Sequence, residues 1–251
     1  MSRGLVCFDM DRVLVDHLST WQWVYDKLGI NNDESFALYN QGKLDEWSWI
    51  ILDLALIKQG CIDNLGEELR DAHIREWLED CPMMMGWRDC IQSMLDADLE
   101  VAIISGGMQH TARQIAASFP SEEKWRRKWG SVDRHTAREK MGGKASRLLV
   151  FSNGWLANND GTIPDTGRFH VQMNGKGTVV KMLQRRLGIT RENTYSIGDS
   201  AGDISMFHES GFSINFNPWD DRPKEHADIV IEEKDLILVA QEIQKKIDQK
   251  L

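Results

Sequence analysis

The stretch Leu5-Val6-Cys7-Phe8-Asp9-Met10-Asp11-Arg12-Val13 joins a short apolar run to two acidic residues one position apart. The apolar run has the length of a buried β-strand, and strand side chains alternate between faces, so Asp9 and Asp11 start on the same side of the chain. At the carboxyl end of a parallel strand, such a pair opens into the crevice where α/β sheets bind ligands. Two carboxylates this close repel each other unless a cation or a proton lies between them. Taken alone, the pair also fits a solvated turn after a strand.

Composition narrows the class of protein. The chain has 251 residues, enough for one large domain or for a core domain with a smaller one. Its net charge of −9 disfavours binding to nucleic-acid phosphates, and no apolar stretch is long enough to cross a bilayer. The N-terminus lacks the apolar core of a signal peptide, and the four cysteines fit reduced, buried thiols without metal-type spacing. We expect a cytoplasmic protein without a nucleic-acid or membrane partner, present as a monomer or a homodimer.

Short apolar runs alternate with amphipathic helices along most of the chain, which predicts an α/β fold with a parallel sheet covered on both faces. The expected strands are residues 4–8, 99–104, 194–197, 212–216 and 228–231. The expected helices are residues 89–97, 108–118, 176–187, 201–210 and 234–249.

Three segments depart from this alternation. Residues 16–81 read as helices alone, with Gly29 closing the first, Gly42 and Gly60 punctuating the next, and a third amphipathic run over Asp63–Leu78. We expect this block to form a lid over the carboxyl end of the first strand. Residues 121–147 carry nine Lys or Arg against four Asp or Glu, and fit a solvated excursion or a subunit contact; a hairpin-like region follows around residues 158–161.

Four segments place polar groups at the ends of expected strands or helices. The first holds Asp9 and Asp11. The second is Ser105-Gly106-Gly107, at an expected strand-to-helix junction, where a hydroxyl, free N–H groups and a helix N-terminus can hold an anion. The third, Gly175-Lys176-Gly177, puts an ammonium at the start of a helix, and the fourth, Gly198-Asp199-Ser200-Ala201-Gly202-Asp203, gives two carboxylates four residues apart.

These groups together fit a phosphoryl-transfer site. Carboxylates select a hard cation, and Mg²⁺ binds where a few protein oxygens are joined by water and phosphate. Each segment also has an ordinary explanation: a tight turn at Ser105-Gly106-Gly107, a solvated Lys176, and an acid favoured by the helix dipole at Asp203. Those explanations do not account for all four segments occurring in this order, each at the end of an element.

The order of the segments resembles the haloacid dehalogenase superfamily, and in particular its phosphoserine phosphatase-like branch. The similarity covers nearly the full length and is closest in Asn174-Gly175-Lys176-Gly177, in the fourth segment with the residues up to Phe207, and in Ala227-Asp228-Ile229. It implies a Rossmann-like core formed by residues 1–15 and 82–251, with a helical cap, residues 16–81, inserted after the first motif.

The resemblance also implies roles for individual residues. Asp9 matches the nucleophile that forms an aspartyl-phosphate, and Asp11 matches the acid that protonates the leaving group and later deprotonates water. Mg²⁺ would be held by Asp9, by the backbone carbonyl of Asp11 and by Asp199, with Asp203 close by. The phosphoryl oxygens would be held by Ser105, the Gly106 N–H and Lys176. A second lysine on that helix, Lys181, lacks flanking glycines, so Lys176 is the better match.

The chain departs from the family in its cap. Phosphoserine phosphatases use a cap glutamate to hold the amine of the substrate, and the matching position here is Leu18. They also use a cap arginine to hold the substrate carboxylate, but this chain has no arginine between Arg12 and Arg70. The planar fork of arginine is hard to replace at a carboxylate site, so we expect a substrate other than phosphoserine. Close relatives also carry asparagine where this chain has Gly202, which affects the detail of metal or phosphate positioning.

The composition of the cap does not determine which leaving group the substrate carries. Residues 16–80 hold fourteen Asp or Glu against five Lys or Arg, together with five tryptophans. The tryptophans could contact a cationic head group or stack on a sugar, or they could simply form the core of a small helical bundle. His17 could contact a substrate or lie at the surface at a helix start.

We therefore expect a Mg²⁺-dependent phosphomonoesterase that acts on a small phosphorylated metabolite through an aspartyl-phosphate. One alternative is a phosphotransferase that uses the same intermediate. Another is a catalytically silent binding protein on the same scaffold, for which Gly202 is the one favourable feature.

Overall fold

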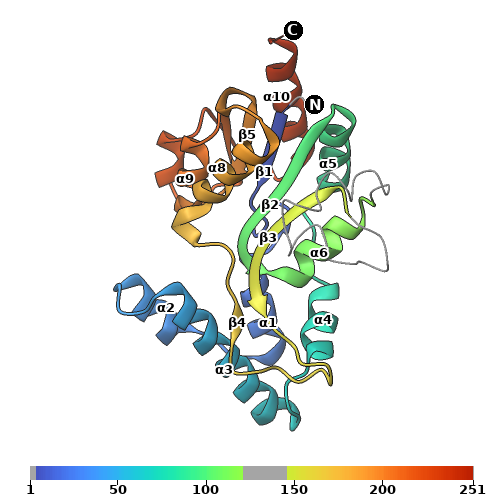
Figure 1. The fold of residues 1–251 in the computed structure, drawn as a ribbon. Helices are drawn as coiled ribbons and strands as arrows, with labels where there is room; N and C mark the ends of the chain where they lie inside the picture. The colour runs from blue at the N-terminus through green and yellow to red at the C-terminus, as the bar shows by residue number, and fades with distance from the viewer. Residues whose placement is uncertain (1–3, 121–145, 251) are drawn as a thin grey trace.

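A twisted, mostly parallel sheet runs through the computed structural model, which describes residues 4–120 and 146–250 (Figure 1). In the described part of the chain the strand order is β4-β3-β2-β1-β5-β6-β7, and β4 alone is antiparallel to its neighbour. The strands are β1 (Gly4–Phe8), β2 (Leu99–Met108), β3 (Leu148–Trp155), β4 (Gly167–Arg168), β5 (Thr194–Gly198), β6 (Phe212–Phe216) and β7 (Ile229–Ile231). The predicted α/β class with a Rossmann-like sheet is confirmed.

Helices cover both faces of this sheet, as the near-continuous apolar strands require. The helices are α5 (Trp87–Asp96), α6 (Gln109–Ala117), α8 (Lys176–Leu187), α9 (Ile204–His208) and α10 (Leu236–Asp248). One core cluster joins Val6 and Phe8 of β1 to α5, α6 and α10. The other joins Leu5 and Cys7, which point to the opposite face, to α8 and to Met206 of α9. Asp9 follows the second set in the alternation, so it lies on the α8 side.

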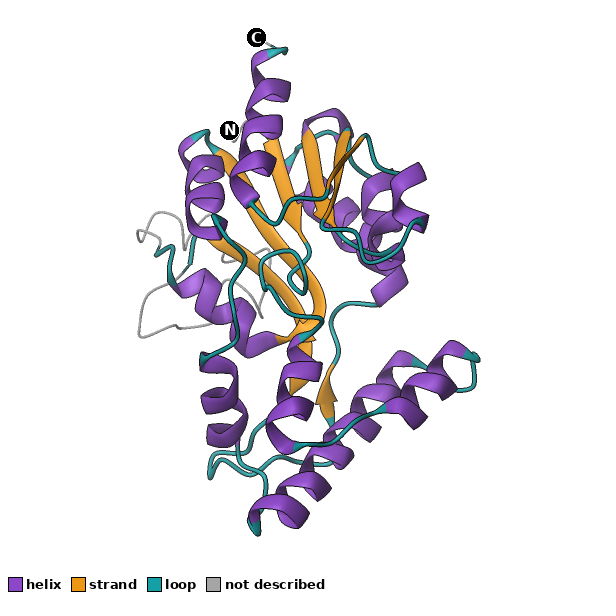
Figure 2. Ribbon diagram, turned by 180° about the vertical axis from the view of Figure 1, so that it is seen from behind, coloured by secondary structure: helices purple, strands orange, loops and turns teal. Residues whose placement is uncertain are grey.

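Between β1 and α5 the chain forms four helices that lie beyond the carboxyl ends of β1, β2 and β3 (Figures 1 and 2). They are α1 (Thr20–Leu28), α2 (Asp33–Asn40), α3 (Glu46–Leu65) and α4 (Asp71–Glu79). Their apolar side chains form a separate cluster that includes Val24, Leu54 and Ile74, and Trp155 at the end of β3 belongs to it. The four helices therefore have a core of their own and rest on the end of the sheet.

Two boundaries within this helical block differ from the prediction. Gly60 lies inside α3, where an added Cβ would come within 2.9 Å of Ile30 Cγ2, so the glycine permits close packing and does not end the helix. The predicted helix over Asp63–Leu78 is wrong, because α3 ends at Leu65 and Gly66 follows with φ +72° before α4 begins. Gly29 does close α1, with φ +65°.

The sheet differs from the prediction in the length of β2, in the presence of β3 and in the hairpin. β2 continues through Ser105-Gly106-Gly107 to Met108, so these residues end the strand before α6 begins at Gln109. The prediction omitted β3, a fully buried strand parallel to β2. The expected hairpin is present only in part, since Gly154 and Trp155 of β3 pair with the two residues of β4 across a long loop.

Nearly all of the basic segment 121–147 lies outside the described residues. Within the described ranges, no helix combines the length and the apolar character needed to span a bilayer.

Candidate active site

The order of the central strands brings the sequence motifs to one edge of the sheet. β1 lies between β2 and β5, with Phe8 level with Ile103 on one side and with Ile197 on the other. The residues that follow Phe8 therefore meet the ends of both neighbours, and the Asp9 N–H donates to the Ile197 carbonyl at 2.9 Å. Carboxyl ends of parallel strands form the ligand-binding edge of α/β sheets.

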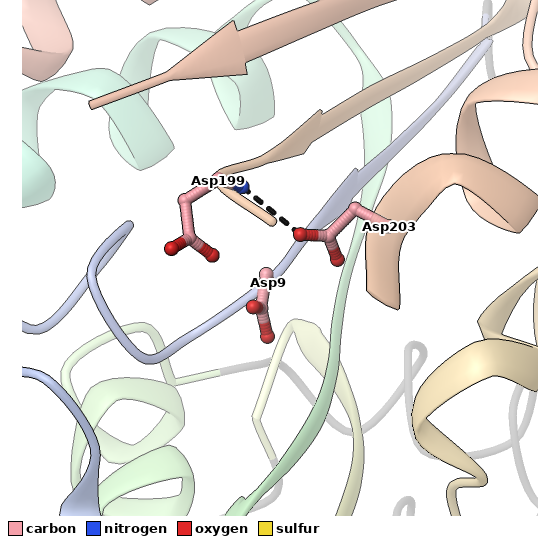
Figure 3. Close-up of side chains that lie close together, drawn as sticks. All are labelled: Asp9, Asp199 and Asp203. Carbon is pink, nitrogen blue, oxygen red and sulfur yellow. Dashed lines mark hydrogen bonds between the residues drawn. The ribbon is translucent and has the colours of Figure 1, made fainter. Parts of the chain in front are cut away.

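Three buried carboxylates gather at this edge. Asp9, Asp199 and Asp203 each offer one oxygen to a group whose members lie within 4.8 Å of one another (Figure 3). Asp203 is fully buried, and its Oδ2 accepts hydrogen bonds from the Asp199 N–H at 2.9 Å and the Ser200 N–H at 3.1 Å. Asp203 therefore shapes the loop that carries Asp199, and its side chain lies against Gly198, where an added Cβ would come within 2.2 Å.

Lys176 supplies the positive charge next to this group. Its Nζ lies 2.8 Å from Asp9 Oδ1 and 2.6 Å from Asp203 Oδ1, and the side chain is only 4% exposed. Burial acts to lower the pKa of Lys176, but Asp203 and Asp9 outweigh it and raise the pKa, which keeps the ammonium charged. Lys181 points away, pairs with Glu209 and is half exposed, so the structure brings Lys176 and not Lys181 to the aspartates.

Asp11 is held by the first turn of the cap. Its Oδ1 accepts from the Thr20 N–H at 2.9 Å and its Oδ2 from the Thr20 hydroxyl at 3.5 Å. The same hydroxyl oxygen accepts the N–H of Met108 at 2.8 Å. Thr20 therefore links the cap, Asp11 and the end of β2.

Ser105-Gly106-Gly107 lies beside these groups. The Ser105 hydroxyl oxygen accepts the Gly107 N–H at 3.0 Å, and the Gly106 carbonyl accepts the indole N–H of Trp21 at 3.1 Å. A Cβ on Gly107 would come within 2.5 Å of Asp11 Oδ2, so a side chain here would displace that carboxylate. The predicted strand-to-helix junction is thus the tail of a strand, still next to Asp11.

Desolvation dominates the electrostatics of the site. Burial raises the pKa of Asp9 to about 6 against the pull of Lys176, and burial with the neighbouring Asp9 charge raises the pKa of Asp11 to about 7. Burial also raises the pKa of Asp199 well above its ordinary value, although Lys176 and Arg12 oppose the shift. Buried carboxylates that destabilise one another in this way fit a site built for a divalent cation with oxygen ligands.

Comparisons with known proteins find chains similar to this one. A family model described as haloacid dehalogenase-like hydrolase matches residues 169–243, which include Lys176, Asp199 and Asp203. The phosphoserine phosphatase of Methanocaldococcus jannaschii is 25% identical over 93% of this chain and 94% of its own length. The phosphoserine phosphatase of Wolinella succinogenes is 28% identical over 92% of this chain and 96% of its own length.

The comparisons support the haloacid dehalogenase superfamily and, within it, a phosphatase of the phosphoserine phosphatase-like branch. A solved structure described as a phospho-aspartyl intermediate analogue of phosphoserine phosphatase shares the fold, with a TM-score of 0.68 and 23% identity over 96% of this chain and 99% of that one.

The phosphatase also has contacts that its motifs did not reveal. Thr20 and Trp21 reach the site from α1, and Arg12 reaches Asp199 from the turn after β1. The only sequence signal for Thr20 was the serine before it, which caps α1 by accepting the Gln22 N–H. No sequence pattern links Arg12 to Asp199, because 187 positions separate them.

The structure also shows the contacts of the cap residues at which this chain departs from the family pattern. Leu18 is exposed, and His17 packs edge-on against Trp23 and pairs with Asp26. Trp23 and Trp77 pack against the helical core, with the Trp23 indole donating to the Trp77 carbonyl, as the bundle interpretation of the tryptophans expects.

Proposed function

We propose that this phosphatase is a Mg²⁺-dependent phosphomonoesterase that hydrolyses a small phosphorylated metabolite through an aspartyl-phosphate on Asp9. The observation that supports it best is the buried group of Asp9, Asp199 and Asp203 with Lys176 bridging two of them. This arrangement pairs a carboxylate nucleophile with charges that can hold an anionic phosphoryl group.

The reaction would proceed in two steps. In the first, an Asp9 oxygen attacks phosphorus, the bond from phosphorus to the leaving oxygen breaks, and Asp11 donates a proton to that oxygen. In the second, Asp11 takes a proton from water, the water oxygen attacks phosphorus, and the bond to Asp9 breaks. The raised pKa of Asp11, about 7, allows the group to act first as an acid and then as a base.

The remaining groups would hold the phosphoryl oxygens and the cation. Lys176, Ser105 and the Gly106 N–H would contact the phosphoryl oxygens, and Lys176 would also keep Asp9 in place. The Mg²⁺ ligands would be Asp9, the Asp11 backbone carbonyl and Asp199, with Asp203 supporting Asp199 through its backbone N–H. When bound, the cation neutralises charge on the phosphoryl oxygens during transfer.

The substrate would not be phosphoserine, although the full-length relatives named above are phosphoserine phosphatases. In this cap the position of the amine-binding glutamate is Leu18, and no arginine lies between Arg12 and Arg70. Residues 42–49 correspond to the stretch that carries the carboxylate-binding arginine in the family. Glu46 in this stretch already accepts hydrogen bonds from the Met173 N–H and the Tyr39 hydroxyl. These residues offer no forked cation for a carboxylate.

The two-step reaction fits a division of the chain into a core and a cap. The core would be residues 1–15 and 82–251, and the cap residues 16–81. The cap would exclude water during phosphoryl transfer and admit it for the second step. We also propose a cytoplasmic location, which the four unpaired, buried cysteines support.

The test is phosphate release from a panel of phosphoesters, measured with Mg²⁺ and then with EDTA. The panel holds phosphoserine, phosphocholine, phosphoethanolamine and sugar phosphates. We expect one of the last three classes to be preferred, with release abolished by EDTA and restored by Mg²⁺. Preference for phosphoserine would contradict the substrate proposal, and release that resists EDTA would contradict the metal.

The same panel separates the two alternatives. A phosphotransferase would form a new phosphoester when alcohols are added as acceptors. A silent binding protein would release no phosphate from any compound yet bind one of them tightly.

A further inference from the structure

Arg12 adopts a backbone conformation that favours glycine. It follows Asp11 directly, and its φ of 62° lies in the left-handed region. Such a conformation persists in a larger residue only where the surroundings hold it. The side chain is 19% exposed and reaches Asp199, to whose Oδ2 its Nε donates at 3.0 Å.

A second segment holds the other end of the guanidinium. The Arg12 Nη2 donates to the Asn217 carbonyl at 2.9 Å, and the Asn217 amide donates back to the Arg12 carbonyl at 3.1 Å. The Trp219 ring covers the guanidinium, with 4.9 Å from Cζ to the ring centroid, and the Trp219 N–H donates to the Asp199 carbonyl at 2.9 Å. The residues after β6 and the turn after β1 thus form one frame around Asp199.

Of the two carboxylate oxygens of Asp199, this frame contacts only one. Oδ2 accepts the Arg12 hydrogen bond, and Oδ1 accepts none from the described residues. Asp199 shares the three-carboxylate group with Asp9 and Asp203. A carboxylate fixed through one oxygen presents the second in a constant direction, and hydrogen bonds of this kind set the affinity of metal sites.

We propose that Arg12 is a positioning residue, which holds Asp199 so that its second oxygen faces the cation site. The inference rests on the proposed use of Mg²⁺. Arg12 contacts neither the nucleophile nor Asp11 through its side chain, so its effect reaches the reaction through Asp199.

The positive charge of Arg12 also repels a cation, so removing it would have two opposite effects. The decisive variant is therefore Arg12→Lys, which retains the charge. An ammonium cannot reproduce the planar fork that contacts Asp199 and Asn217 together. Lysine is also a non-glycine residue, so the cost of the left-handed backbone stays the same.

The experiment is calorimetric titration of the full chain with Mg²⁺ alone. We expect Arg12→Lys to bind Mg²⁺ about 10- to 100-fold more weakly than the unmodified chain. Arg222→Lys is the matched control, because Arg222 also makes a forked contact with an aspartate, Asp220, at 2.9 and 3.0 Å, but its side chain is 72% exposed and bonds Asp220, not Asp199. Its Mg²⁺ affinity should not change.

A second variant covers the case in which Arg12→Lys does not fold. Trp219→Ala removes an exposed ring from above the guanidinium and should weaken Mg²⁺ binding several-fold. With p-nitrophenyl phosphate, Arg12→Lys should need more Mg²⁺ for half-maximal rate, while kcat at saturating Mg²⁺ and KM for the ester stay near the original values.

Three results would overturn the inference. Equal Mg²⁺ affinity in the unmodified chain and Arg12→Lys would show that Arg12 does not position Asp199. A raised KM for the ester with unchanged Mg²⁺ affinity would make Arg12 a substrate contact. No Mg²⁺ binding by the unmodified chain would remove the metal from the proposed function and this inference with it.

Discussion

Lys176 holds two carboxylates that would otherwise face each other without compensation. Asp9 and Asp203 are both buried and both lie within 2.8 Å of its ammonium. Removing one partner of a buried ionic group leaves uncompensated charge and costs about 3–5 kcal/mol. We predict that Lys176→Met lowers the free energy of unfolding by about this amount and also abolishes phosphate release.

Urea unfolding followed by far-UV circular dichroism measures the loss. Lys181→Met is the matched control, because Lys181 lies on the same helix with a half-exposed side chain and should change stability by less than about 0.5 kcal/mol. Equal stability of the two variants would mean that Lys176 does not neutralise the buried pair.

Residue spacing alone can identify groups that lie on one strand or one turn. Asp9 with Asp11, and Asp199 with Asp203, are close in sequence and each pair follows a strand, so the sequence suffices to propose them. Arg12 with Asp199 cannot be proposed in this way, since their contact depends on how the turn after β1 meets the loop after β5. Sequence spacing carries no information on such a contact.

At the scale of elements, α4 of the cap is fastened to α6 and β3 of the core. Asp71 accepts the Trp155 indole N–H at 2.7 Å and the Arg75 Nε at 2.6 Å, and the Arg75 Nη1 lies 3.3 Å from His110 Nδ1. Burial and then the charges of Arg75 and Arg113 lower the pKa of His110 to about 4, against the opposing charge of Asp71. His110 is therefore neutral in the folded protein at pH 6.

This shift predicts a pH-dependent loss of stability. Between pH 6.5 and 4 the unfolded chain binds a proton at His110 that the folded chain does not, so the free energy of unfolding falls as the pH falls. We predict that the unmodified protein loses about 2 kcal/mol more than His110→Gln over this range. Urea unfolding of both proteins at pH 7 and pH 4 measures the difference, and equal losses would contradict the buried, neutral histidine.

Most elements could be predicted because their apolar periodicity is clear, as in α5, whose four buried residues Cys90, Ile91, Met94 and Leu95 follow the helical repeat. The errors occurred where tertiary packing outweighs a local signal. Gly60 suggests a helix end but instead gives Ile30 room. Ser105-Gly106-Gly107 suggests a turn, yet pairing with β3 keeps Ser105 in the strand. The prediction omitted β3 because its apolar run, residues 148–151, is short and is followed by Ser152, Asn153 and Gly154.

At the scale of the whole molecule, the tip of the cap meets the core next to Lys176. Glu46, the first residue of α3, accepts the Met173 N–H at 2.9 Å, and Met173 lies three residues before Lys176. Trp47 packs edge-on against Phe169 along the same seam, 6.3 Å between ring centroids. We therefore expect movement of the cap to be coupled to the segment that carries the lysine.

We predict that Glu46→Ala weakens this seam. Loss of a hydrogen bond worth about 1 kcal/mol should lower kcat/KM roughly 5-fold and speed amide hydrogen exchange at residues 173–177. Glu46→Gln keeps an oxygen for the Met173 N–H and should restore most of the activity. If Glu46→Ala left both exchange and kcat/KM unchanged, the contact would have no role in closure.

The fold class could be predicted at this scale because alternation of strands and helices has few solutions in three dimensions. The contacts between cap and core could not, since Glu46 and Met173 are 127 positions apart and share no motif.

The proposed mechanism requires Asp9 to carry the phosphoryl group during turnover. The most direct measurement is to quench the protein with borohydride during turnover and to map the products by peptide mass spectrometry, because borohydride reduces an acyl phosphate to an alcohol. We predict conversion of Asp9 to homoserine, dependent on the phosphoester and on Mg²⁺, and absent in Asp9→Asn, which should fold normally but have no turnover. Steady phosphate release with Asp9 unconverted, or retained turnover in Asp9→Asn, would contradict the covalent mechanism.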